Sequence, residues 1–93
     1  MINTILTLND YEVLKAIMDK HDKKKGILKT RGTSKKEIII KTNLSYSKVS
    51  QSINKFINDG LIEQGLSVRT SKTYCLTDKG LEEILTLGGI NYD

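Results

Sequence analysis

The chain has 93 residues, a formal net charge of +4 and a hydrophobic fraction of 38%. This length supports one domain with a single core and excludes a core plus a separate enzymatic lobe. No apolar run approaches the roughly 20 residues of a membrane span, and the N-terminus does not look like a secretory signal. We therefore expect one cytoplasmic domain, residues 1–93, whose positive charge favours an acidic partner.

Residues suited to catalysis or metal binding are sparse. Cys75 is the single cysteine, and we expect a buried thiol in the alternating stretch TYCL, with redox sensing as the minor alternative. His21 has no cysteine or carboxylate at ligand spacing except the adjacent Asp22. The serines have no nearby histidine to act as a base. We therefore expect no enzyme activity, no catalytic residue, no metal and no cofactor.

The first predicted element is an amphipathic helix from about Asn9 to His21. Its apolar residues recur at spacings of three and four: Tyr11, Val13, Leu14, Ile17 and Met18. Thr7 or Asn9 can cap this helix, the latter with Glu12 three residues on. Gly26 ends the run.

A basic segment follows this helix. Its charged residues are Lys20, Lys23, Lys24, Lys25, Lys29 and Arg31 against Asp19 and Asp22. Two interpretations stay open: a solvated helix end, where cations complement the helix dipole, or contact with the backbone of a polyanion. The stretch GILK within the segment can also supply a short strand.

The next two predicted helices are joined by a tight turn. Ser34 and Glu37 form a capping box in front of three isoleucines. Three β-branched residues also suit a strand, but the box before them and the turn TNLS after them favour a short helix. Ser45 caps the second helix, predicted over residues 45–59, and Gly60 ends it at a left-handed position.

The helix over residues 45–59 divides into an apolar and a polar side. The predicted core residues are Val49, Ile53, Phe56 and Ile57, and everything else is expected to point outward. The outward side is centred on Ser47, Gln51, Asn54 and Asn58, with Lys48 and Lys55 on its flanks.

This polar side contains no carboxylate between Leu44 and Ile57. A solvated helix face usually mixes glutamate with lysine. Amides and hydroxyls can pair with base edges, whereas carboxylates would be repelled by phosphate. The pattern therefore favours DNA reading over a merely solvated or protein-binding surface.

The last predicted elements are a hairpin and a helix. Residues 61–76 alternate loosely around the polar tip RTSK, whose basic residues either contact DNA or protect an exposed strand edge. Thr77 caps a helix with Leu81, Ile84 and Leu85 on one face, ending at the glycine pair 88–89. The predicted fold class is mainly α with a small β-hairpin wing.

The order helix, helix, helix, hairpin, helix resembles the winged helix-turn-helix. The phrases LTLNDYEVLKAI, TSKKEIIIKTNLSYSKVSQSINKFINDGLIEQ and LTDKG resemble the MarR family, from Leu6 to about Leu85. Two features depart from that family: the tip SVRTSKT lacks an acid two residues before Arg69, and the terminal helices are short. A compact winged helix of this size is also similar to the TubR type of centromere-binding protein from plasmid and phage partition systems.

The resemblance implies specific contacts with double-stranded DNA. Base reading in the major groove is expected from Tyr46, Ser47, Lys48 and Gln51. Backbone or wing contacts are expected from Lys35, Lys36, Asn54, Lys55, Arg69 and Lys72. The wing, residues 61–76, would reach the minor groove or adjacent phosphates.

Three functions remain open. The first is a homodimeric transcriptional regulator whose dimer surface involves the short amphipathic ends, around Leu6 to Met18 and Leu81 to Leu87. The second is a partition adaptor that binds repeated centromere sites and a tubulin-like GTPase. The third is a protein-interaction module that does not bind DNA.

Overall fold

The protein folds as a small helical domain around a three-stranded sheet. A computed structural model describes residues 7–19 and 22–91, with side chains at 7–19 and 22–86. The elements are α1 (Leu8–Ala16), the 3-10 helix η1 (Lys29–Arg31), β1 (Thr33–Ser34), α2 (Lys35–Thr42), α3 (Tyr46–Asn58), β2 (Ile62–Gln64), β3 (Thr73–Leu76) and α4 (Asp78–Asn91). The predicted order of three helices, a hairpin and a helix is confirmed.

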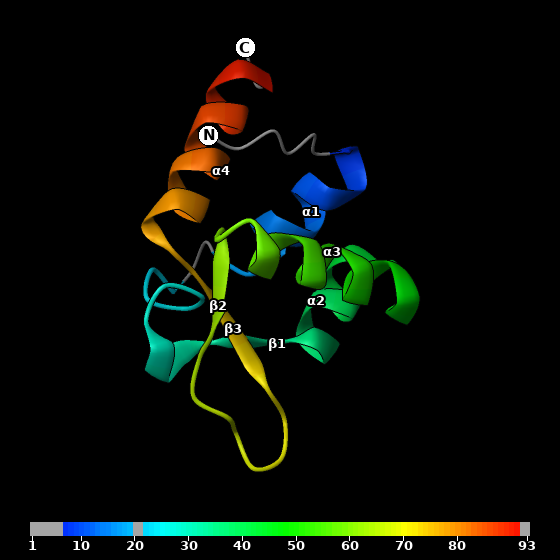
Figure 1. Ribbon diagram of the computed structural model, residues 1–93, viewed down its shortest axis with the longest axis vertical. Helices are drawn as coiled ribbons and strands as arrows, with labels where there is room; N and C mark the ends of the chain where they lie inside the picture. The colour runs from blue at the N-terminus through cyan, green and yellow to red at the C-terminus, as the bar shows by residue number, and fades with distance from the viewer. Residues whose placement is uncertain (1–6, 20–21, 92–93) are drawn as a thin grey trace.

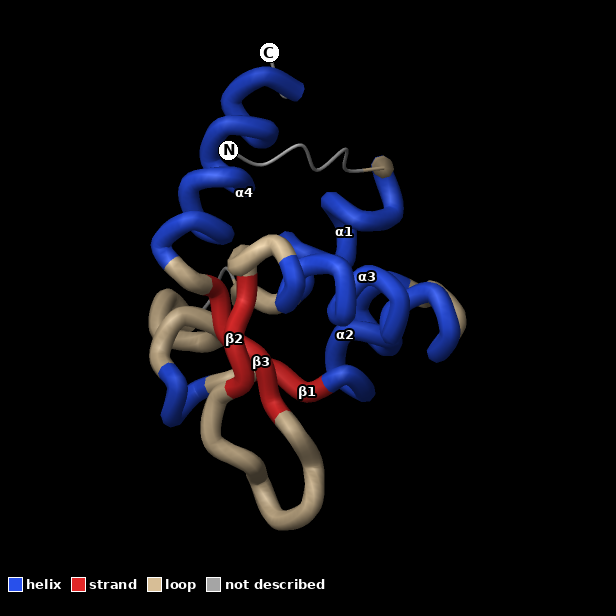
Figure 2. The backbone as a smooth tube through the Cα atoms, in the orientation of Figure 1, coloured by secondary structure: helices blue, strands red, loops and turns tan. Residues whose placement is uncertain are grey.

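The sheet is antiparallel in the order β1-β3-β2 (Figure 2). Thr33 of β1 lies opposite Tyr74 of β3, and Ile62 of β2 lies opposite Leu76. The loop of the hairpin extends to one side of the sheet, whereas α4 extends from the opposite side (Figure 1). β3 therefore joins β1 and β2, which are far apart in the sequence.

The core lies where α1, α2 and α3 meet the sheet. Its fully buried side chains include Leu14, Ile38, Val49 and Phe56. The buried thiol predicted at Cys75 is confirmed, since this residue has no exposed surface. Burial raises the pKa of the Cys75 thiol, and the nearby Glu63 carboxylate raises it further. This thiol is therefore held in its protonated form.

The first helix is shorter than predicted. It is capped by Thr7, which forms a capping box with Asp10, and it ends at Ala16. The last carbonyls of α1 accept hydrogen bonds from later segments: Thr33 Oγ1 donates to Ile17 O at 2.6 Å, and Lys41 Nζ donates to Ala16 O at 3.1 Å. These donors replace the next helical turn. The predicted endpoint His21 lies outside the described residues.

The predicted two-helix unit is confirmed in detail. Ser34 and Glu37 form the capping box of α2, and Ser45 accepts the Lys48 backbone N–H at the start of α3. Asn43, in the turn between the helices, has φ of 59° and so adopts the left-handed conformation that asparagine tolerates. Of the three isoleucines, Ile38 is buried and Ile40 is exposed.

Two other boundaries differ from the prediction. The stretch GILK does not form a strand: Lys29 begins η1, and the added strand is β1 at Thr33. The helix α4 does not stop at the glycine pair but continues to Asn91. Gly60 has φ of 75°, as its predicted left-handed position requires.

None of the helices in the described part of the chain has the length and the apolar composition that a membrane span requires.

Candidate functional site

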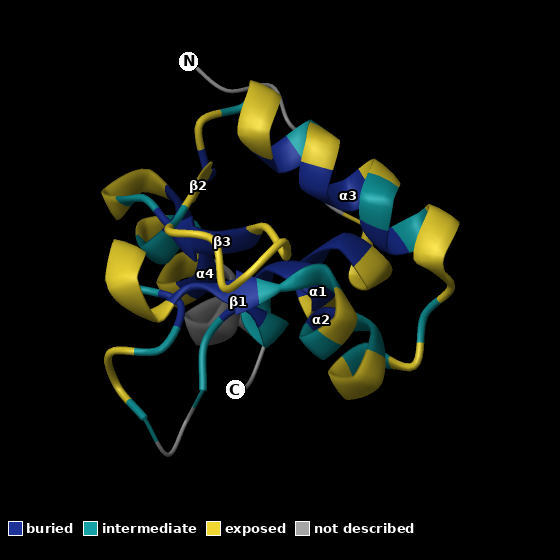
Figure 3. Cartoon of the chain, turned by 90° about the horizontal axis from the view of Figure 1, so that it is seen from below, coloured by how far each residue is buried: buried dark blue, intermediate teal, exposed yellow. Residues whose placement is uncertain are grey.

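The polar face of α3 is open to solvent. Exposed and buried residues alternate along α3 (Figure 3) with the helical period. The exposed residues include Ser47, Gln51, Asn54 and Asn58, and the buried ones are Val49, Ser52, Ile53 and Phe56. The central outward residues are thus placed as predicted.

Two residues of α3 were predicted on the wrong side. Ile57 was expected in the core, but it is 43% exposed because it lies at the edge of the apolar arc. Ser52 was expected outside, but it is buried, and its hydroxyl donates a hydrogen bond of 2.8 Å to Asp10 Oδ1. A short hydroxyl side chain can be buried when a partner satisfies it. That partner comes from α1, 42 residues earlier.

A groove of about 480 Å³ runs between α3 and the hairpin loop. Its lining residues are Ser34, Lys35, Lys36, Tyr46, Asn54, Thr70, Ser71, Lys72 and Tyr74. Five predicted contact residues therefore share one groove, although they come from α2, α3 and the hairpin. In the described part of the chain, neither Lys36 nor Lys72 has a carboxylate partner. The groove is therefore suited to an anion.

Tyr46 is held at the edge of this groove by Lys35. The Lys35 ammonium lies 4.7 Å from the centroid of the Tyr46 ring and 3.5 Å from its hydroxyl. This contact places a cation over the face of an aromatic ring. Tyr46 is nevertheless 65% exposed, so much of this residue remains accessible to a ligand.

The base of the hairpin is fixed, and its tip is exposed. Leu66 N donates to Lys29 O at 2.9 Å, and Thr73 Oγ1 donates to Leu66 O at 2.6 Å. Arg69 is exposed at the tip, with φ of 58°, and it lines a second hollow on the side of Lys25 rather than the groove beside α3. Arg69 and Lys72 therefore line two different hollows, although the two residues are close in sequence.

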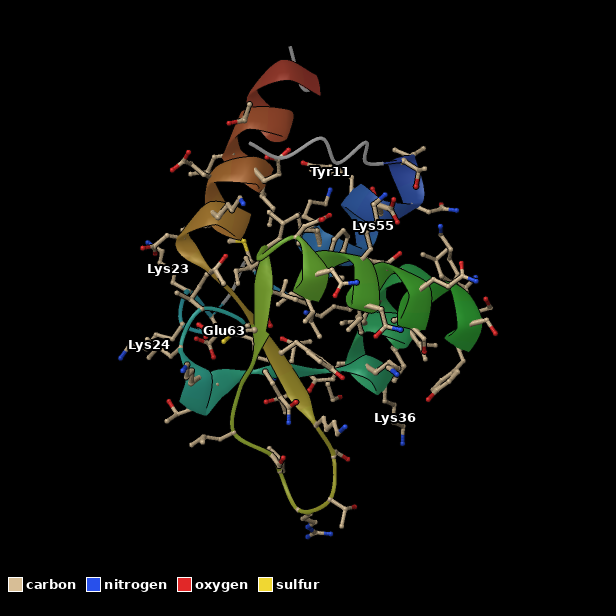
Figure 4. All side chains as sticks on the ribbon, viewed as in Figure 1. Tyr11, Lys23, Lys24, Lys36, Lys55 and Glu63 are labelled. Carbon is tan, nitrogen blue, oxygen red and sulfur yellow. The ribbon has the colours of Figure 1, made fainter. Side chains whose placement is uncertain are left out.

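The opposite flank of α3 faces α1, and α1 carries a buried carboxylate there. Asp10 is only 3% exposed. Its Oδ2 lies 2.9 Å from Lys55 Nζ, and its Oδ1 lies 3.7 Å from Lys48 Nζ. In Figure 4, Lys55 lies between α3 and α1, whereas Lys36 projects from the start of α2 on the side of the hairpin loop. Two of the predicted DNA-contacting lysines are therefore engaged within the protein.

The electrostatics of Asp10 follow from its partners. Burial by itself would raise the pKa of this carboxyl, but hydrogen bonds from Lys55, Ser52 and the Thr7 backbone outweigh burial and hold the pKa well below its usual range. Asp10 is therefore ionised at neutral pH. Asp10 was not among the predicted site residues, although its position three residues after Thr7 fits a capping box.

The described residues contain no group of three or more His, Cys, Asp or Glu side chains that could hold a metal ion. His21 lies outside the described residues. The chemistry that this surface offers is hydrogen bonding and positive charge, supplied by amides, hydroxyls and ammonium groups.

Several solved structures share this fold. The chain is similar to MepR, a transcription regulator of the Staphylococcus aureus multidrug efflux pump MepA, with 15% identity, a TM-score of 0.73, and coverage of 91% of this chain and 57% of MepR. It is similar to a MarR family transcription regulator, with 17% identity, a TM-score of 0.75, and coverage of 94% and 52%. The chain thus spans little more than half the length of these regulators.

A third similar structure is the DNA-binding TubR fragment from Clostridium botulinum, with 21% identity and a TM-score of 0.68. Here the match covers 90% of this chain and 99% of the fragment. No curated protein shows significant similarity to the chain. The family model described as winged helix-turn-helix matches residues 10–90, and the chain therefore belongs to the winged helix-turn-helix family.

Proposed function

We propose that this protein binds double-stranded DNA sequence-specifically, as a homodimeric transcriptional regulator acting on DNA in the cytoplasm. The observation that carries the proposal is the exposed, carboxylate-free face of α3 beside a groove lined by Lys35, Lys36 and Lys72. A helix of this kind fits the major groove, where amides and hydroxyls can meet base edges. The adjacent lysines can then neutralise phosphates.

The proposed contacts divide into two kinds. Ser47 and Gln51 are exposed near the start of α3 and read bases, together with Tyr46 and Lys48 at its margins. Backbone contacts come from the groove residues Lys35, Lys36, Asn54 and Lys72, and from Arg69 at the wing tip. Base contacts provide specificity, whereas phosphate contacts position the protein on the duplex.

The proposed dimer uses the outer sides of the first and last helices. Leu8 of α1 is 75% exposed and Leu85 of α4 is 66% exposed, and exposed leucines of this kind are suited to burial against a second copy. Other predicted members of this surface, Leu6 and the Leu87 side chain, lie outside the described residues. A symmetric dimer would place two α3 helices on half-sites about 10 bp apart.

A partition adaptor is the second candidate function. It is supported by the likeness to the DNA-binding TubR fragment, which the match covers over 99% of the fragment's length. In this role the protein would bind repeated centromere sites and a tubulin-like GTPase. The surface used on DNA would be the same.

Selection of bound fragments from random duplexes tests the proposal. A regulator should select a single inverted repeat, whereas a partition adaptor should select tandem repeats. A dimer that neutralises about 6 to 10 phosphates should also lose about 10³-fold or more in affinity between 50 and 200 mM salt. Binding with no selected sequence and no salt dependence would contradict DNA recognition and favour a protein-interaction module.

A further inference from the structure

We infer that Asp10 is a positioning residue for α3: it holds Lys55 against α1 and away from DNA phosphates, and it holds Lys48 beside the reading face. This inference rests on the proposed DNA binding. It starts from a contact between α1 and α3, in which Lys55 Nζ donates to Asp10 Oδ2 at 2.9 Å. The two residues are 45 positions apart in the sequence.

The orientation of Asp10 is fixed from several directions. The backbone N–H of Thr7 donates to Oδ2 at 3.2 Å, and the hydroxyl of Ser52 donates to Oδ1 at 2.8 Å. The carboxylate also lies in the first turn of α1, where the helix dipole favours negative charge. A buried carboxylate with these partners cannot turn towards solvent without leaving donors unsatisfied. It is therefore a fixed anchor for the side chains that reach it.

The two lysines differ in how firmly they are held. Lys55 makes a direct hydrogen bond to Asp10, whereas the Lys48 ammonium stands 3.7 Å from Oδ1. Lys48 also lies in the first turn of α3, beside the exposed Ser47. Lys55 thus links α3 directly to α1. Lys48 is held less firmly, so its ammonium can turn towards a nearby ligand while its ion pair with Asp10 lengthens.

This arrangement makes the flanks of α3 unequal in charge. On the groove side, Lys36 and Lys72 have no carboxylate partner in the described part of the chain. On the α1 side, Asp10 offsets part of the charge of Lys48 and Lys55. Excess positive charge attracts every DNA sequence alike. Asp10 therefore favours discrimination between sites over general affinity.

The first test measures the Lys55 contact without DNA. In nitrogen-15 spectra of lysine ammonium groups, Lys55 should give a slowly exchanging signal in the wild-type protein, because its protons are donated to a buried carboxylate. The isosteric Asp10→Asn variant should lose this protection. A Lys55 signal that exchanges as fast as that of Lys36 in the wild type would overturn the inference, whatever the protein does with DNA.

The second test measures the salt dependence of DNA binding. In Asp10→Asn, the released lysines should contact phosphates, so the slope of log K against log salt should steepen by about 0.9 for each new contact. Affinity for random DNA should rise several-fold, and the ratio of specific to random binding should fall. The matched control is Asp78→Asn, which makes the same change at an exposed carboxylate in the first turn of α4, outside the proposed dimer surface. It should leave both quantities unchanged.

A third variant separates positioning from simple stabilisation. When Asp10 is present, Lys55→Met should leave the slope of log K against log salt unchanged, because Lys55 is already hydrogen-bonded to Asp10. In the Asp10→Asn background the same substitution should reduce the slope by about 0.9. A slope that already falls when Asp10 is present would assign Lys55 directly to DNA and overturn the inference. The single Lys55→Met variant gives this result even if Asp10→Asn fails to fold.

If the wild-type protein shows no salt-dependent DNA binding, the proposed function fails. The ammonium spectra then still decide whether Asp10 holds Lys55. The two failures are therefore distinguishable.

Discussion

The buried and exposed sides of α3 show how one 13-residue helix can meet two separate demands. On the buried side, Val49 and Phe56 have no exposed surface, whereas Ser47 and Gln51 on the other side are exposed to solvent. The buried side holds the helix in place by excluding water from apolar surface. The exposed side is left to meet a ligand. Stability and recognition should therefore respond to different substitutions on the same element.

The largest effect is expected from Phe56→Ala on the buried side. Phe56 is fully buried, so its removal should lower the free energy of unfolding by about 3 to 5 kcal/mol through lost burial and a cavity. Urea denaturation followed by circular dichroism measures this loss. The neighbouring Ile57→Ala should cost clearly less, because Ile57 is 43% exposed. Equal losses for the two variants would show that the division into two sides is wrong.

The next effect is expected from Gln51→Ala on the exposed side. It should weaken binding to the selected DNA site by about 1 to 3 kcal/mol and relax the preference at one base pair, while leaving the free energy of unfolding unchanged. Titration with the selected site and with single-base variants measures both quantities. An equal loss of affinity for specific and random DNA would contradict the base-reading role of Gln51.

A smaller effect is expected from Lys36→Ala in the groove. Lys36 is exposed and has no carboxylate partner in the described part of the chain, so the substitution should weaken all DNA sequences about equally. The salt slope should fall by about 0.9, since one phosphate contact is lost. Lys79→Ala, an exposed lysine on α4, is the matched control. Lys36 is not a phosphate contact if the two variants bind alike.

The smallest effect is expected from Asp10→Asn, at the contact between α1 and α3. It is a change in the pH dependence of the free energy of unfolding. Because its partners hold the pKa of Asp10 below its usual range, this residue contributes stability that is present above about pH 4 and is lost as the pH falls towards its folded-state pKa. The difference in unfolding free energy between the wild type and Asp10→Asn should therefore be smaller at pH 3 than at pH 6. Urea denaturation at both pH values measures it, and an unchanged difference would contradict the prediction.

Much of the fold could be predicted because its signals are local. Ser34, Ser45 and Thr77 each satisfy a backbone N–H within three residues, so the starts of α2, α3 and α4 follow from short stretches of sequence. Gly60 likewise occupies a backbone conformation that glycine adopts easily. The outward placement of Ser47 and Gln51 follows from the helical period alone.

The errors arose where distant groups compete with local preference. The end of α1 depends on Thr33 and Lys41, which reach its carbonyls from 16 and 25 residues later. Ile57 lies at the margin of its helical arc, where small differences in packing decide its exposure. The pairing of Lys55 requires Asp10 to be buried beside it, and helical periodicity carries no information about that partner.

The sequence by itself determined the order of helices and strands, the caps that begin them, and a reading face without negative charge, because each depends on residues within a few positions of one another. Only the tertiary structure decided that Lys35, Lys36 and Lys72 line one groove while Lys48 and Lys55 meet Asp10 on the opposite flank of α3. The physical reason is that the effective charge of a lysine depends on its spatial neighbours, which packing brings together from distant parts of the chain.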